Sequence, residues 1–166
     1  LDPCLFYFRK DSLFAMMVFV VDDIIFASTS QVFNDNLVKK FRARFKIKDM
    51  GVPKYILGIH IDYDREKGVL KLNQERYIKA VAKRFGFRDA KGTSMPHNTT
   101  KLCQAMCGKH AGTAEKMSKY PYMELLGCLL YLCLTRPDIW VMVSEMSKYN
   151  SDPGVPMWNA LVHLMR

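Results

Sequence analysis

The sequence predicts an α+β chain in which strands dominate the first part and helices dominate the last. Runs rich in Val, Ile, Phe and Tyr alternate with turn residues up to residue 72. Apolar residues at helical spacing recur between those runs and again after residue 73. With 166 residues, 49% of them hydrophobic, the chain has enough apolar material for one ordinary domain or two small subdomains. We therefore expect strands, a helix, strands and then helices.

Two adjacent acids mark the first strand-rich part. Asp22 and Asp23 interrupt an otherwise apolar run over residues 13–28. Burying a carboxylate costs several kcal/mol unless it is paired or bound to a cation, so the two acids need an explanation. The simplest is a hairpin with a strand Leu13–Val21, a tight turn carrying both acids, and a return strand Ile24–Ala27. The acids would then lie at a strand end, where a divalent metal or solvent can take their charge.

The other elements of the first part follow from periodicity and turn chemistry. We expect a strand over Leu5–Arg9, and an N-cap at Ser28–Ser30 that starts a helix. The apolar positions of this helix are Val32, Phe33, Leu37, Phe41 and Phe45. The basic residues of this segment are Lys39, Lys40, Arg42, Arg44 and Lys46. They form either a solvated face or a phosphate-facing surface. A single strand is predicted over Tyr55–Tyr63, with a return strand over Val69–Leu72.

Helices are predicted for most of the remaining chain. One opens at residues 73–75 and runs through Phe85, with Tyr77, Ile78, Val81, Ala82 and Phe85 on its inner face. Arg88–Gly112 is predicted to be a long irregular surface loop. Tyr122–Leu134 is apolar nearly all round, so it should be buried. Two further helices are expected, over Asp138–Tyr149 and from Met157 to Met165.

Charge and cysteine content narrow the class of protein. The 25 Lys and Arg against 16 Asp and Glu give a net charge of +9, which favours a polyanionic partner, nucleic acid first and an acidic membrane second. The five cysteines are irregularly spaced, which indicates reduced intracellular thiols. No segment is expected to span a membrane, because two charges break the run around Asp22 and Tyr122–Leu134 is too short. The abrupt start and the end within a helix suggest a piece of a longer protein.

Six sequence blocks carry a family resemblance. Residues 20–25 read VVDDII, 45–51 FKIKDMG, 56–59 ILGI, 72–78 LNQERYI, 122–132 YMELLGCLLYL and 135–139 TRPDI. In this order they resemble the reverse transcriptase of Ty1/copia-type LTR retrotransposons, almost end to end. In that family the first block has the sequence Tyr-Val-Asp-Asp and the last has the sequence Thr-Arg-Pro-Asp-Ile.

The resemblance implies nucleotidyl transfer with two Mg²⁺ (or Mn²⁺) ions, which take oxygen ligands. Asp22 would be the direct metal ligand from the hairpin, with Asp23 supporting the site; the alternative is a simple polar turn. Lys48 matches a loop whose lysine can protonate pyrophosphate, although an ordinary surface lysine fits equally.

The resemblance also implies nucleic-acid contacts. Leu57 and Gly58 match the strand that grips the primer terminus, the alternative being an ordinary turn glycine. Lys79, Lys83 and Arg84 would contact a duplex through its phosphates without reading sequence.

The implied architecture is a partial polymerase palm followed by helical thumb and connection regions. The palm, an antiparallel sheet with the catalytic hairpin and a primer-grip-like strand, would cover 1–72, the thumb-like helix and loop 73–112, and the connection 113–166. Expected partners are an RNA template, an RNA/DNA or DNA/DNA duplex, a dNTP substrate, and the N-terminal palm and fingers and C-terminal RNase H of the same polyprotein. The expected location is intracellular, in cytoplasmic virus-like particles, the nucleus, or both.

The chain departs from the family in two places. Val20 replaces the aromatic residue that helps to seat the primer end, and Met157 precedes Trp158 where the family usually has His. A third carboxylate is expected from an earlier palm strand. These departures fit a decayed copy as well as a functional variant.

One competing site and two functions remain open. The spacing of His97, Cys103, Cys107 and His110 resembles an incomplete zinc knuckle. Cys128 and Cys133 are expected to be core residues. The first function is part of a reverse transcriptase that is inactive in isolation. The alternative is a non-catalytic, decayed or domesticated remnant that binds nucleic acid.

Overall fold

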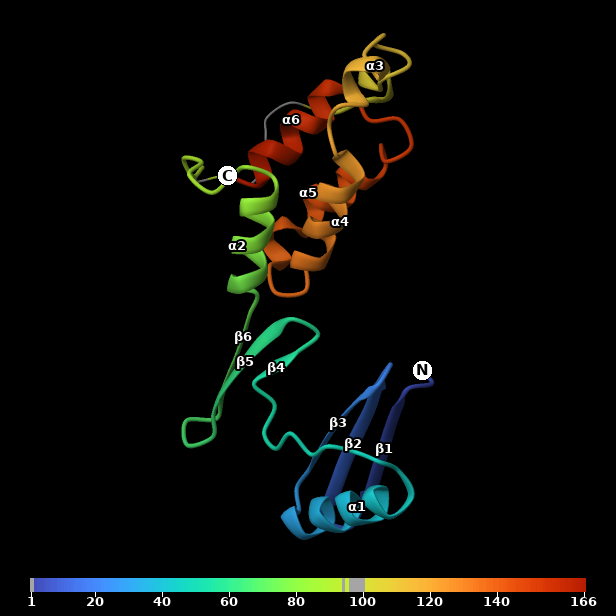
Figure 1. Ribbon diagram of the computed structural model, residues 1–166, viewed down its shortest axis with the longest axis vertical. Coiled ribbons are helices and arrows are strands. Elements are labelled where there is room, and N and C mark those ends of the chain that lie inside the picture. Colours follow the sequence, from blue (N-terminus) through green and yellow to red (C-terminus); the bar gives the residue numbers. More distant parts are fainter. Residues whose placement is uncertain (1, 94, 96–100) are drawn as a thin grey trace. The chain divides into compact units, whose positions relative to one another are not determined.

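The computed structural model describes residues 2–93, 95 and 101–166, and the chain divides into two compact units (Figure 1). We call Leu1–Val52 the N-terminal unit and Pro53–Arg166 the C-terminal unit. Together they form an α+β chain, as the sequence predicts. Within the described residues, no helix combines the length and hydropathy needed to cross a bilayer.

The N-terminal unit is a three-stranded antiparallel sheet with one helix. Its elements are β1 (Leu5–Lys10), β2 (Leu13–Val20), β3 (Asp23–Ser28) and α1 (Gln31–Arg44), and the strand order is β1-β2-β3. The predicted cap of α1 is confirmed, since the Ser30 side chain accepts a hydrogen bond from the Phe33 backbone N–H at 3.3 Å.

Helix α1 covers one face of this sheet. The Phe8 ring stacks on Phe33 with 5.9 Å between centroids, and Ser28 Oγ donates to Asn34 Oδ1 at 2.7 Å. Side chains alternate along a strand, so Asp23 and Ile25 lie on the opposite face from Ser28.

The C-terminal unit joins a second small sheet to a helical body. The sheet has the order β4-β5-β6, from β4 (Tyr55–Ile56), β5 (Ile59–Asp64) and β6 (Val69–Asn73). The helices are α2 (Glu75–Arg84), η1 (Gln104–Met106), α3 (Ala114–Met117), α4 (Tyr122–Leu132), η2 (Pro137–Ile139), α5 (Trp140–Ser147) and α6 (Val155–Leu164). Their inner residues form one core, which includes Leu125, Leu129, Val143, Met157 and Leu161.

Two predictions about this unit are wrong. The single strand expected over Tyr55–Tyr63 is a hairpin, because the chain reverses at Leu57 and Gly58. Helix α4 is buried on one side only, with Met123 and Leu130 63% and 44% exposed. The apolar composition of α4 therefore overstates its burial.

Other features agree with the sequence or refine it. The predicted inner face of α2 is confirmed, with Val81 buried and Tyr77, Ile78 and Phe85 packed against the core. The expected 88–112 loop contains the short helix η1. All five cysteines are free thiols; Cys133 is buried, as expected, and Cys128 is half-buried against the core.

Candidate functional site

The paired acids lie at the tip of the predicted β-hairpin. Val20 and Asp23 are partners across β2 and β3, so the turn consists of Val21 and Asp22. The prediction that both acids occupy the turn is therefore wrong by one residue, because Asp23 begins the return strand. Val21 has a φ of 55° and is 95% exposed. A β-branched residue rarely adopts this left-handed conformation, so the tight turn imposes it.

The two carboxylates are exposed and adjacent. The side chains of Asp22 and Asp23 form no hydrogen bond or ion pair with any of the described residues. Carboxylate oxygens are the donors that Mg²⁺ prefers, so the donor type fits a divalent metal. In the part of the chain that is described, no group of three or more His, Cys, Asp or Glu side chains is placed to hold a metal. Among the described residues, the hairpin therefore supplies two carboxylates and no third potential ligand is grouped with them.

Lys48 lies in the loop after α1 and belongs to the same unit. Its neighbour Asp49 is tied down, because Arg42 pairs with it at 3.5 Å and the Gly51 N–H donates to it at 2.9 Å. No hydrogen bond or ion pair joins Lys48 to Asp22 or Asp23 within the described residues. The loop is thus anchored next to an exposed lysine.

Leu57 and Gly58 form the two-residue turn between β4 and β5. Both have positive φ, 47° and 76°, which is the geometry of a type I′ hairpin. Only glycine adopts such angles without steric cost, so Leu57 carries the strain of this turn. A Cβ on Gly58 would lie 3.1 Å from the hydroxyl of Tyr131, which shows how closely α4 approaches the turn.

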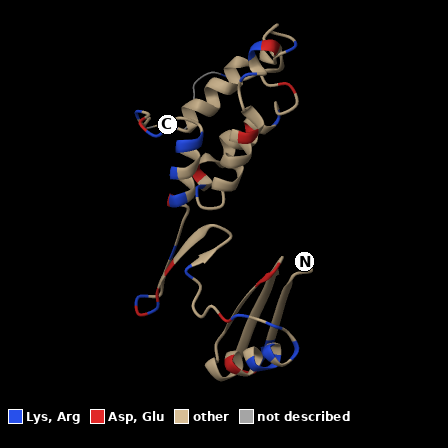
Figure 2. Ribbon diagram, in the orientation of Figure 1, with Lys and Arg blue, Asp and Glu red and all other residues tan. Residues whose placement is uncertain are grey.

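The predicted basic residues of α2 differ in whether they form ion pairs. Figure 2 shows cationic residues along this helix. Lys79 pairs with Glu75 at 2.6 Å, and Arg84 pairs with Glu124 of α4. The Glu75 pKa is lowered by the hydrogen bond from Lys79. Lys83 is exposed and has no ionic partner in the described part of the chain.

A buried glutamine to which residue-based reasoning gave no role connects three of the sequence blocks. Gln74 is 2% exposed and precedes α2. Its Nε2 donates to the Tyr131 backbone carbonyl at 3.2 Å, and its Oε1 accepts from the Thr135 hydroxyl at 2.6 Å. We call these contacts the Gln74 clamp. A polar residue just before an amphipathic helix was the available signal, but its partners lie about sixty residues away along the chain.

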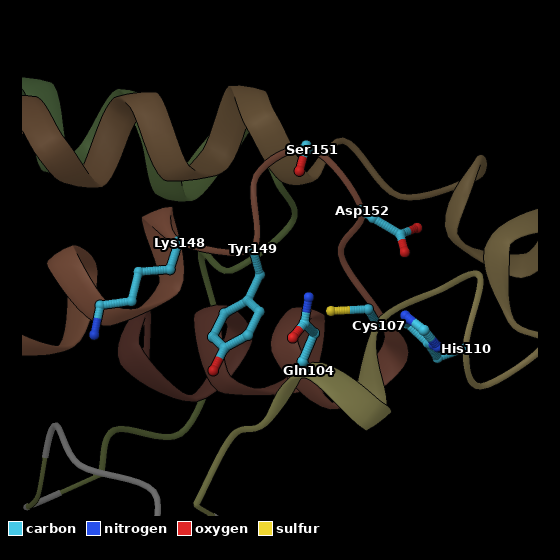
Figure 3. Close-up of a pocket in the computed structure, with 7 residues that line it drawn as sticks. All are labelled: Gln104, Cys107, His110, Lys148, Tyr149, Ser151 and Asp152. Carbon is cyan, nitrogen blue, oxygen red and sulfur yellow. The ribbon is translucent and has the colours of Figure 1, made fainter.

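A cavity of about 360 Å³ near the predicted zinc set is a separate feature (Figure 3). The seven side chains around it include Cys107, His110 and Asp152, with the Cys107 sulfur directed inward. Burial and the nearby Asp152 carboxylate raise the Cys107 pKa, which disfavours the reactive thiolate. His97 lies outside the described residues. Those described include no metal-ligating group of three, so the structure gives the zinc interpretation no support.

The sequence comparisons identify the family. The family described as reverse transcriptase (RNA-dependent DNA polymerase) matches residues 5–99, which is more than half of the chain. The chain therefore belongs to the reverse transcriptase family. Its relatives place it in the Ty1/copia group of that family.

Relatives from plants and yeast cover nearly the whole chain. It is 32% identical over 168 residues to the retrovirus-related Pol polyprotein from transposon TNT 1-94 of Nicotiana tabacum, covering 99% of this chain and 13% of that protein. Identity is 29% to the Pol polyprotein from transposon RE2 of Arabidopsis thaliana, over 99% of this chain and 11% of that protein. The putative transposon Ty5-1 protein YCL074W of Saccharomyces cerevisiae is 28% identical, over 89% and 46%. No solved structure matches the chain.

Proposed function

We propose that the chain provides the catalytic hairpin, primer grip and thumb of a retrotransposon RNA-directed DNA polymerase. The observation that carries this proposal is the exposed hairpin tip, which presents two adjacent carboxylates, Asp22 in the two-residue turn and Asp23 at the start of β3. The substrates would be an RNA template, an RNA/DNA or DNA/DNA duplex and a dNTP. The chain spans 13% and 11% of its first two relatives, so the polymerase would act as part of a longer polyprotein with palm, fingers and RNase H regions.

In this proposal the hairpin positions two oxygen donors. Asp22 would be the direct ligand of Mg²⁺ or Mn²⁺, and Asp23, held in β3, would support it. The bound ions supply charge stabilisation to the attacking and leaving oxygens of nucleotidyl transfer. Lys48 would donate a proton to the departing pyrophosphate.

The remaining assignments divide the chain into a palm, a thumb and a connection region. Leu57 and Gly58 would grip the primer terminus, because their turn is narrow and the glycine has no side chain. Lys79, Lys83 and Arg84 would face duplex phosphates from the thumb. The palm would comprise 1–72, the thumb 73–112 and the connection 113–166.

We further propose that the isolated chain is inactive as a polymerase. The resemblance implies a third carboxylate from an earlier palm strand, and the described residues offer no group of three potential ligands. Primer extension by the purified 166-residue chain with Mg²⁺ would contradict this proposal.

The metal assignment is tested with Mn²⁺ as a paramagnetic probe. In NMR spectra of the full chain, Mn²⁺ should broaden the amide resonances around Asp22 first. The variant Asp22→Asn should abolish that broadening, and Asp23→Asn should weaken it.

A matched control lies in the other hairpin of the same sheet. Asp11, at the turn between β1 and β2, also has a positive φ and an exposed carboxylate. Asp11→Asn should leave the broadening unchanged. Equal broadening at both turns would show adventitious binding to carboxylates and would contradict the assignment.

The second candidate function is non-catalytic binding of nucleic acid. The net charge of +9 and the cations on α2 favour it. It predicts salt-dependent binding of an RNA/DNA hybrid that is unaffected by Asp22→Asn. In the polymerase proposal, the same substitution in the longer polyprotein abolishes primer extension while binding persists.

A further inference from the structure

An aromatic and basic cluster forms where the second sheet meets α2. The Arg76 guanidinium lies over the Tyr55 ring, 4.8 Å from its centroid. The Tyr55 ring also contacts the imidazole of His60, with 4.8 Å between centroids, and these two residues are partners across β4 and β5. Asn73 of β6 holds the imidazole through a 3.0 Å contact between its Nδ2 and the His60 Nδ1. Residues of β4, β5 and β6 thus support one exposed guanidinium of α2, through its contact with Tyr55; we call these four residues the Arg76 cluster.

The carboxylate nearest to this cluster in sequence is already engaged. Glu75 takes the Lys79 ammonium at 2.6 Å, which lowers the Glu75 pKa. Among the described residues, Arg76 has no carboxylate partner. Arg84, by contrast, is paired with Glu124. The guanidinium of Arg76 therefore lies on the Tyr55 ring and forms no ion pair among the described residues.

The contact with a ring differs chemically from an ion pair. A guanidinium over an aromatic face is held by the ring's electrons, so its N–H groups remain free to donate. Those N–H groups form a planar fork that matches two oxygens of a phosphate. An arginine fixed in this way loses less conformational entropy on binding than one that is free in solution.

We propose that Arg76, held by Tyr55, is a principal phosphate contact of this chain with nucleic acid, ahead of Lys79 and Arg84. The inference rests on the proposed function and deepens it, because it names the residue through which the thumb region binds the duplex. Lys79 and Arg84 must first leave Glu75 and Glu124 before they can bind a phosphate, whereas Arg76 need not leave any carboxylate within the described residues.

The chain contains a matched control for this proposal. Arg65, in the turn between β5 and β6, lies over the Tyr63 ring at 5.7 Å and is likewise exposed. It has the same charge and the same kind of aromatic contact, on the same small sheet, but lies away from α2. Arg65→Gln therefore removes an equivalent charge without touching the Arg76 cluster.

The experiment measures binding of a fluorescently labelled RNA/DNA hybrid to the full chain over a series of salt concentrations. Each phosphate contact contributes about 0.9 to the slope of log K against log salt concentration. Arg76→Gln should weaken binding about tenfold at low salt and reduce that slope by about one. Arg65→Gln should change affinity by less than about twofold, and Lys79→Gln should weaken binding by less than Arg76→Gln does, because Lys79 must first leave Glu75.

Two further variants separate the contact from the stability of the fold. Arg76→Lys should keep the slope but lose affinity, because it retains the charge and loses the planar fork. Tyr55→Leu should also keep the slope and lose affinity, because the guanidinium is no longer held. A merely structural role of Arg76 would lower the thermal stability of the C-terminal unit and leave the slope unchanged.

The outcomes distinguish this inference from the proposed function. If the wild-type chain binds and Arg76→Gln behaves like Arg65→Gln, the Arg76 assignment is overturned while nucleic-acid binding stands. If Lys79→Gln or Arg84→Gln has the larger effect, the order of contacts proposed here is wrong. A wild-type chain that does not bind at low salt would overturn the binding function itself, and the inference with it.

Discussion

Gly154 shows how a single missing side chain permits the packing of the C-terminal unit. A Cβ at this position would lie 1.8 Å from the Met106 carbonyl oxygen, so two backbone segments meet there with no space between them. Gly127, on α4, has nothing within 4 Å of the same constructed atom. A side chain at position 154 would therefore clash with the backbone, whereas a side chain at position 127 would point into open space.

This contrast gives a paired prediction. Gly154→Ala should destabilise the C-terminal unit by about 3 kcal/mol, because backbone must move to admit the methyl group. Gly127→Ala should stabilise it by about 0.5–1 kcal/mol, since alanine is the better helix former. Urea unfolding followed by tryptophan fluorescence measures both, because Trp140 and Trp158 lie in this unit. Equal effects of the two substitutions would contradict the packing argument.

Val21 is the strained residue of the acidic hairpin. Its positive φ is unfavourable for a β-branched side chain, and its 95% exposure means that no packing compensates. Val21→Gly should therefore stabilise the N-terminal unit by about 1 kcal/mol. Amide hydrogen exchange in β2 and β3 measures this change. Asp11→Gly is the control: aspartate tolerates this region better, so the gain should be smaller.

At the scale of elements, the Gln74 clamp holds the start of α2 against the end of α4. Replacing Gln74 by Leu removes both hydrogen bonds and leaves the Tyr131 carbonyl and the Thr135 hydroxyl without this partner. Both groups are only partly buried, and the Tyr131 carbonyl still accepts from the Leu134 N–H at 3.4 Å, so we expect a loss of about 1–2 kcal/mol for Gln74→Leu, near the value of the two hydrogen bonds.

A double-mutant cycle tests whether the clamp acts as one unit. Thr135→Val alone should cost about 1 kcal/mol. If the two side chains interact directly, adding Thr135→Val to Gln74→Leu should cost much less than it does alone. Strict additivity of the two free energies of unfolding would show that the 2.6 Å contact contributes nothing to stability. Tryptophan fluorescence again gives the measurement.

Local sequence patterns predicted the helices and strands better than they predicted the contacts between them. Ser30 caps α1 as expected, because a cap depends on residues only three positions apart. The strand predicted over Tyr55–Tyr63 does not include the turn at Leu57, because leucine rarely adopts positive φ; the alternative of a turn glycine at Gly58 agrees with the structure. The exposure of Leu130 was missed as well, because composition records hydrophobicity and not which side of a helix has a neighbour.

Part of the candidate site was predictable from the sequence as well. The acids at Asp22 and Asp23 stand out because charge in an apolar run is costly. The Arg76 cluster could not be found in this way. Its ring, imidazole and guanidinium come from different elements, and only folding brings Tyr55, His60 and Arg76 together.

On the scale of the whole molecule, the buried Tyr122 and the partly buried Tyr77 should make the C-terminal unit sensitive to alkali. Burial raises the pKa of Tyr77 to about 12 and raises that of Tyr122 as well, and the Tyr122 hydroxyl donates to the Met146 carbonyl at 2.8 Å. Since the unfolded phenol has a pKa near 10, the folded state retains protons that the unfolded state releases above that pH. This contribution is complete below about pH 10 and is lost as the pH rises towards 12.

The free energy of unfolding of the C-terminal unit should therefore fall between about pH 10 and 12. Tyr122→Phe should reduce this dependence, while costing about 1 kcal/mol at neutral pH through the lost hydrogen bond. Tyr7→Phe, at an exposed position in the N-terminal unit, is the control and should leave the profile unchanged. Urea titrations at several pH values give the profile, and a steep fall that persists in Tyr122→Phe would assign it to other groups.

The pairing of Val20 with Asp23 makes the length of the acidic hairpin as important as its composition. Because strand side chains alternate, inserting one residue between Asp23 and Ile25 would bring the residues that follow to the other side of the sheet. Ser28 would lose its place beside Asn34, while both aspartates would still be present in the sequence. An insertion or deletion of a single residue in β3 would thus change the register and the facing side chains of the hairpin without changing either acid. Counting aspartates alone would not reveal the damage.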